Sequence, residues 1–129
     1  MSTSTQPAFS VEQIGQICIS VSDIDRATAF YRDVLGLPLL FAAGSMSFFQ
    51  AGSVRLMLSL PDRPEFEPPG SILYYKVADL DSAFATLSAR GAKVEAPPRL
   101  IARMPDHELW MAAFRDSEGN FFELMHEKR

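Results

Sequence analysis

The pattern of apolar and polar residues alternates between two periods along the chain. Short apolar runs at residues 14–21 and 71–77 are typical of strands, and each precedes a segment whose apolar side chains recur every three or four positions. That spacing predicts two amphipathic helices. Their apolar faces comprise Ile24, Ala27, Tyr31, Val34 and Leu35 in the first helix, and Leu80, Ala83, Phe84 and Leu87 in the second.

The two strand–helix units resemble one another in sequence. VSDIDRATA in the first superposes on VADLDSAFA in the second after a shift of 56 residues. Asp23 and Asp79 are the predicted N-caps of the two helices. Gly36 and Gly91 are predicted to end them, because glycine adopts the left-handed conformation that follows many helices. The repeat predicts two modules of one kind.

Three strand-like runs follow each helix: LPLLF, SMSFFQ and SVRLMLSL after the first, and KVEAP, LWMAAF and NFFELMH after the second. The pattern therefore predicts an α+β fold of two βαβββ modules, residues 11–60 and 70–127, packed around a shared cavity. The proline-rich segment 61–70 is the predicted linker. Residues 1–10 are predicted to be a disordered tail, and residues 11–129 a single domain.

Composition and charge narrow the class of protein. The chain has 129 residues, a net charge of -4 and no cluster of Lys and Arg, so neither nucleic acid nor a membrane surface is an expected partner. Cys18 is the single cysteine, which excludes an intrachain disulfide and fits a reducing compartment. The first ten residues lack the pattern of a signal peptide. We therefore expect a cytoplasmic protein.

The segments ICISVSDIDRATAFYRDVLGL and FRDSEGNFFELM resemble the opening and closing signatures of the vicinal oxygen chelate superfamily, the glyoxalase, bleomycin-resistance and dioxygenase group. The resemblance implies a cupped, mostly antiparallel sheet around a cavity. It implies less about activity, because the superfamily includes several chemistries and some proteins that only bind. Members commonly form two-fold dimers, so a homodimer is expected here.

The resemblance also implies four positions for metal ligands, two in each module. Counting along the strands and aligning SVRLML with NFFELM fills them with Gln16, Leu56, Ile72 and Glu123. Leucine and isoleucine cannot coordinate a cation, and a Zn²⁺ or Mn²⁺ site needs three or four protein ligands. Gln16 and Glu123 are thus the metal candidates. His107 is a third if the segment APPRLIARMPDHE folds over the cavity mouth; otherwise it is a capping residue of the next strand.

Glu123 is the candidate catalytic residue. It lies in an apolar run, and an unpaired buried carboxylate is costly, so we expect it to face the cavity. Strand alternation supplies most of the other candidates for ligand binding. The predicted set is Gln16, Cys18, Phe48, Leu56, Leu58, Ile72, Tyr74, Trp110, Phe121 and Met125. The alternative for these side chains is that they simply fill a core.

Two hypotheses about function follow. In the first, the protein binds a small apolar or aromatic molecule between its modules without a full metal site, and Gln16, Glu123 and Tyr74 orient the ligand. In the second, it is a lyase or isomerase of glyoxalase I type, whose Zn, Ni, Mn or Fe ion polarises a carbonyl group. Without a metal, Glu123 could still act as a general base, with its pKa raised by burial. The two missing ligands favour the binding hypothesis over the metal-dependent enzyme.

Overall fold

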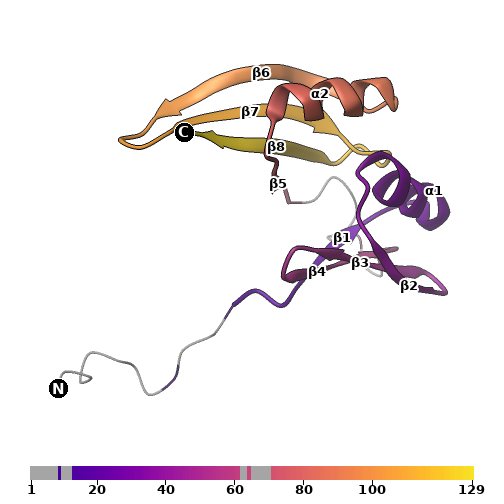
Figure 1. Cartoon of the computed structure of the whole chain (residues 1–129). Helices are drawn as coiled ribbons and strands as arrows, with labels where there is room; N and C mark the ends of the chain where they lie inside the picture. Colours follow the sequence, from indigo (N-terminus) through magenta and orange to yellow (C-terminus); the bar gives the residue numbers. More distant parts are fainter. Residues whose placement is uncertain (1–8, 10–12, 62–63, 65–70) are drawn as a thin grey trace.

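The computed structural model describes residue 9, residues 13–61, residue 64 and residues 71–129. Most of the predicted tail and most of the predicted linker lie outside the described residues. Two four-stranded sheets are present, each with its own helical segment (Figure 1). Both sheets are mixed, because one parallel strand pair accompanies two antiparallel pairs in each. The predicted α+β fold of two βαβββ modules is confirmed.

Module 1 contains the sheet β1-β4-β3-β2. Its strands are β1 (Gln16–Ser20), β2 (Leu39–Ala43), β3 (Met46–Ala51) and β4 (Val54–Ser59). The helix predicted after β1 has two parts, α1 (Ile24–Ala29) and a π-helical segment η2 (Phe30–Val34).

Module 2 repeats this plan with the sheet β5-β8-β7-β6. Its strands are β5 (Leu73–Lys76), β6 (Lys93–Arg103), β7 (Glu108–Arg115) and β8 (Phe121–Lys128). Its helix is α2 (Leu80–Ala89). No helix in the described part of the chain is both long and apolar enough to span a bilayer.

Both helices begin and end where the sequence predicts. The Asp23 carboxylate accepts a hydrogen bond from the Arg26 amide at 3.0 Å, and that of Asp79 accepts one from the Ser82 amide at 3.2 Å. Each bond satisfies an amide that has no partner within the helix. Gly36 follows η2 with φ of 74°, the left-handed conformation expected after a helix.

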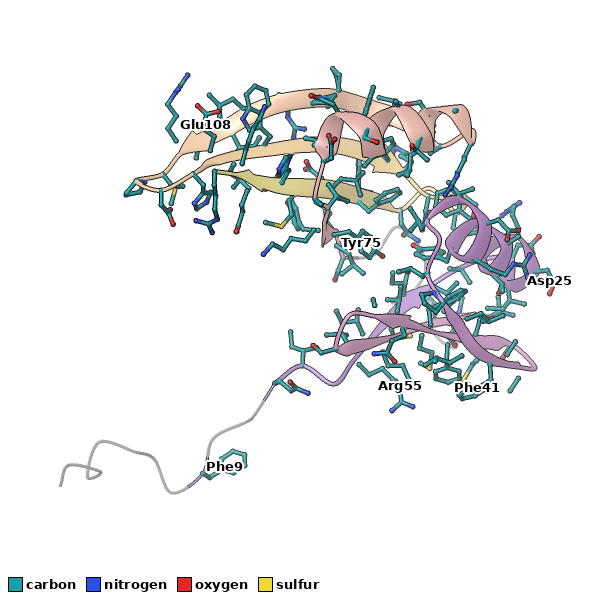
Figure 2. All side chains as sticks on the ribbon, in the orientation of Figure 1. Phe9, Asp25, Phe41, Arg55, Tyr75 and Glu108 are labelled. Carbon is teal, nitrogen blue, oxygen red and sulfur yellow. The ribbon has the colours of Figure 1, made fainter. Side chains whose placement is uncertain are left out.

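Each module buries the face of its sheet that its helix covers. Leu56, Leu58 and Phe49 are buried with Tyr31 in module 1, while Phe114, Phe122 and Leu124 are buried with Leu80 in module 2. We call the other side of each sheet its open face. Figure 2 shows Phe41 and Arg55 on the open face of module 1, pointing away from α1.

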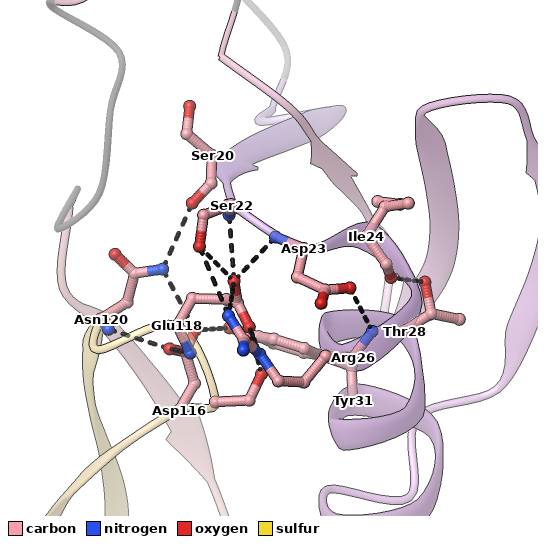
Figure 3. A network of polar contacts seen from close by, with 11 residues as sticks. Ser20, Ser22, Asp23, Ile24, Arg26, Thr28, Tyr31, Asp116, Glu118 and Asn120 are labelled. Atoms are coloured by element: carbon pink, nitrogen blue, oxygen red, sulfur yellow. Dashed lines mark hydrogen bonds and ion pairs between the residues drawn. The ribbon is translucent and has the colours of Figure 1, made fainter.

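A polar network joins the modules at the turn between β7 and β8 (Figure 3). The Glu118 side chain, which has no exposed surface, accepts hydrogen bonds from the amides of Ser22 and Asp23, both at 3.0 Å. Its other oxygen pairs with the Arg26 guanidinium at 2.7 Å. A carboxylate of module 2 thus caps the helix of module 1, where the helix dipole favours negative charge.

Candidate functional site

Glu123 lies on the open face of module 2, opposite Tyr74 of the edge strand β5. Its side chain is 16% exposed and forms an ion pair with Arg99, whose Nη2 lies 3.0 Å from Oε1. Nη1 of Arg99 also donates to the carbonyl of Met111 at 3.1 Å. The sequence analysis found no partner for the Glu123 carboxylate, but in the structure the Arg99 guanidinium is that partner.

Arg99 is a residue that the sequence analysis missed. It belongs to the segment APPRLIARMPDHE, which we expected to be a loop beyond a short strand. Most of that segment instead continues β6 as far as Arg103, with irregular register near its two prolines. Proline is tolerated there because β6 is an edge strand. The apolar run LIA between two arginines was the available signal for this strand.

The assignment of Leu56 as the counterpart of Glu123 is wrong by one residue. Cys18 pairs with Met57 in module 1 as Tyr74 pairs with Glu123 in module 2, so Met57 is the true counterpart. A shift of one residue moves a side chain to the other face of a sheet. Leu56 and Leu58 accordingly face α1 and are buried.

The remaining candidates of module 1 lie on its open face. The Gln16 amide contacts the sulfur of Met57 at 3.9 Å, and Cys18 is exposed beside it on the same strand. Phe48 stacks on Phe41 with ring centroids 4.4 Å apart. The Gln16 amide and the Phe48 ring thus contact side chains of module 1 itself.

In module 2, Phe121 and Met125 share the open face with Glu123, and the Arg115 guanidinium lies 3.9 Å from the Phe121 ring centre. Ile72, just before β5, is 48% exposed. Trp110 is different, because it packs against the buried cluster under α2. It therefore lies on the opposite side of the sheet from Glu123. The expectation that Trp110 would line a site together with Glu123 is thus wrong.

His107 lies in the turn between β6 and β7 and does not reach Glu123. The strand pairing places Glu108 opposite Lys128, five residues along β8 from Glu123. At about 3.4 Å per residue, Glu108 is roughly 17 Å from Glu123 along the sheet, and His107 lies one residue beyond Glu108. Its ring instead contacts the Asp106 carboxylate at 2.7 Å.

These placements do not fit a metal site within one chain. Among residues 13–61 and 71–129, no group of three or more His, Cys, Asp or Glu side chains is close enough to hold an ion. Glu123 is bonded to Arg99, and Gln16 contributes one amide beside a thioether. A divalent ion needs more oxygen or nitrogen donors than this arrangement brings together.

The structure does contain a cavity between the modules. Its volume is about 470 Å³, within the range of about 300–1,000 Å³ that is usual for ligand pockets. Most of its wall is apolar and comes from both modules. Representative lining residues are Ile17, Leu37, Leu56, Leu73, Leu87 and Leu124. Of the residues predicted to bind a ligand, Leu56 and Tyr74 line this cavity, whereas Gln16 and Glu123 do not.

Tyr75 also lines this cavity. Figure 2 shows its side chain in the space between the modules. Its ring lies edge-on to Phe122, with centroids 5.8 Å apart. Its hydroxyl is buried and has no hydrogen-bond partner among the described residues. Burial raises the pKa of Tyr75 and Asp116 adds to the rise, although the Tyr31 hydroxyl acts in the opposite direction.

Known proteins are similar to this chain in both sequence and fold. The family profile described as Glyoxalase/Bleomycin resistance protein/Dioxygenase superfamily matches residues 13–124. The uncharacterized protein YraH of Bacillus subtilis is 29% identical over 126 residues, covering 84% of this chain and 94% of that protein.

Solved structures of known proteins also have a similar fold. A superfamily member from Sphaerobacter thermophilus has a TM-score of 0.72 at 28% identity, covering 91% of this chain and 98% of the other. A lactoylglutathione lyase from Agrobacterium tumefaciens has a TM-score of 0.71 at 26% identity, covering 90% and 94%. Because the profile spans most of its length, this chain belongs to the glyoxalase/bleomycin resistance protein/dioxygenase superfamily.

Proposed function

We propose that the protein binds a small, largely apolar or aromatic molecule in the cavity between its modules, without a bound metal ion. The observation that carries this proposal is the cavity of about 470 Å³ with apolar walls from both modules. Removing apolar ligand surface from water contributes about 25 cal/mol per Å², so such walls can bind a small hydrocarbon skeleton. The lone cysteine is consistent with action in the cytoplasm, and we expect the working form to be a homodimer.

A cavity-filling variant tests this proposal. Ala83 of α2 lines the cavity, whereas Ala85 of the same helix is exposed and does not line it. The neutral fluorophore N-phenyl-1-naphthylamine should raise the melting temperature of the wild type as its concentration increases. Ala83→Phe should abolish that rise by occupying the space, and Ala85→Phe should preserve it. A folded Ala83→Phe protein with an unchanged rise would contradict the proposal.

The alternative function is a divalent-metal-dependent lyase or isomerase. The likeness to the Agrobacterium protein titled lactoylglutathione lyase favours it. The donors around Glu123 do not, because the ion pair with Arg99 already uses that carboxylate. We therefore expect elemental analysis of tag-free protein to find well under one Zn, Ni, Mn or Fe per chain. One ion per chain, lost in Glu123→Gln, would support the enzyme instead.

A further inference from the structure

We infer that the ligand of the inter-module cavity carries a peptide-like unit, an N–H group and a C=O group on the two sides of one carbon atom, and that this unit pairs with the backbone at the free edge of β5. N-acylated amino-acid derivatives with an apolar side chain have this chemistry. The inference rests on the proposed function and names the chemical class of the ligand.

The first step is that the free edge of β5 faces the cavity. β5 lies at the end of its sheet, with β8 as its partner strand among the described residues, and Figure 1 shows it on the side of that sheet nearer to module 1. Residues 73–77 all line the cavity. Because neighbouring side chains of a strand point to opposite faces, a cavity that contacts five consecutive residues lies along the edge of the strand.

The second step is the direction of the backbone groups of β5, which alternate between β8 and the free edge. The Val77 amide donates to the Met125 carbonyl at 2.9 Å, so the odd-numbered residues of β5 direct their N–H and C=O groups to β8. The N–H and C=O groups of Tyr74 and Lys76 therefore point away from β8. They bring donors and acceptors to a cavity whose walls are mostly apolar.

The third step is that the polar side chains of this strand are directed elsewhere. The Tyr75 hydroxyl is buried. Tyr74 lies opposite Glu123 on the open face, and Lys76 shares that face by alternation, with its Nζ 3.6 Å from Oε1 of Glu127. The backbone at the free edge is therefore the polar group that we assign to the ligand.

The fourth step is the pattern that the edge selects. The N–H and C=O groups that one strand residue directs to its neighbour belong to the two peptide groups on either side of its Cα. A single trans amide directs its N–H and C=O groups in opposite directions, so it forms one hydrogen bond with an edge. A residue-like unit forms two, as do peptides that add a strand to a sheet. The cavity of about 470 Å³ has room for one such unit with an apolar side chain.

A matched pair of neutral probes tests the inference. N-acetylphenylalanine methyl ester and O-acetyl-3-phenyllactic acid methyl ester have the same shape, but the second has an oxygen atom in place of the N–H group. Calorimetric titration into the wild type should show the amide binding about 3- to 10-fold more tightly, the effect of one net hydrogen bond. Ala83→Phe should abolish the binding of both probes, because it fills the cavity.

Proline variants test the strand edge itself. Tyr74→Pro and Lys76→Pro each remove an N–H group that points away from β8, and proline is tolerated at such positions of an edge strand. Tyr74→Ala and Lys76→Ala are the controls, because they remove the side chain and keep the N–H group. At least one proline variant, shown by thermal unfolding to be folded, should bind both probes about 3- to 10-fold more weakly than its alanine control.

Three results would overturn the inference and leave the proposed function intact: equal affinities of the two probes for the wild type, folded proline variants that bind like their alanine controls, or an amide probe that still binds Ala83→Phe. If the proline variants do not fold, the ratio of the two probes in the wild type decides. Failure of both probes while N-phenyl-1-naphthylamine binds would also overturn the inference alone. Failure of all three compounds would overturn the proposed function as well.

Discussion

At the scale of single residues, Glu118 shows how one carboxylate holds two modules together. Burial alone would raise its pKa, but hydrogen bonds from Arg26, Ser22 and Ser117 outweigh burial and lower the pKa to about 2. The ordinary value is 4.5. The ionised form is thus favoured in the folded protein, and the stability it contributes is present above pH 4.5 and lost as the pH falls towards 2.

The prediction concerns Glu118→Gln. At pH 7 the variant should lose about 1–3 kcal/mol of unfolding free energy, because an amide cannot replace the charge-assisted bonds to Arg26 and the helix amides. Below pH 4.5 the gap between variant and wild type should narrow. Urea unfolding at pH 7 and pH 3 measures both effects.

Asp33→Asn provides the matched control. Asp33 pairs with its neighbour Arg32 on the surface, and its side chain is 59% exposed. The same change from carboxylate to amide should therefore alter stability by less than about 0.5 kcal/mol. A Glu118→Gln protein that is equally mild, or a gap that does not depend on pH, would mean that the network adds little to stability.

At the scale of elements, the sequence indicates helices more reliably than it indicates the faces of strands. The caps Asp23 and Asp79 were predictable because capping depends on the side chain and its next few residues. The strand face depends on the turn that comes before it. In module 1, a two-residue turn connects the paired residues Ala51 and Val54. In module 2, the five residues 116–120 connect the corresponding pair, Arg115 and Phe121. Aligning the turn glycines therefore reversed the side on which Leu56 lies.

The same reasoning explains what could be predicted of the candidate site. Glu123 shares its face with Phe121 and Met125 by simple alternation within one strand. Its partner Arg99 comes from a strand two positions away in the sheet, beyond β7. Such a pairing depends on the order of the strands in the sheet and on the length of the arginine side chain. The local sequence pattern does not indicate the strand order. The cavity beside Tyr75 depends in turn on how the modules pack.

The α2 N-terminus gives a prediction at this scale. Asp79→Ala should lower the unfolding free energy by about 1 kcal/mol, because it leaves the Ser82 amide without its acceptor. The loss should remain moderate, since His126 Nδ1 accepts a separate hydrogen bond from the Leu80 amide at 3.3 Å. Thermal unfolding measures the change. Ser88→Ala, at an exposed position of the same helix, should be neutral or slightly stabilising, and an equal loss there would rule out a capping effect.

At the scale of the whole molecule, the open faces expose apolar side chains to water, and this exposure is unfavourable. Phe41 in module 1 and Tyr74 in module 2 are each 50% exposed, and Leu40 of the edge strand β2 is 46% exposed. Exposed apolar groups that gather on a surface mark sites of association. A second copy of the chain could cover both faces through one two-fold axis, since such an interface uses the same surface twice.

We therefore expect light scattering at micromolar concentration to give a mass near twice the 14.3 kDa of one chain. Phe41→Glu should shift the mass towards one chain, because it places a charge where the interface would exclude water. Val94→Glu on β6 changes an apolar residue that is 39% exposed but pairs with Phe114 on the helix side of its sheet, and it should leave the mass unchanged. A wild-type mass of 14.3 kDa would exclude the dimer under these conditions, and equal effects of the two variants would show that the association is not specific to the open face.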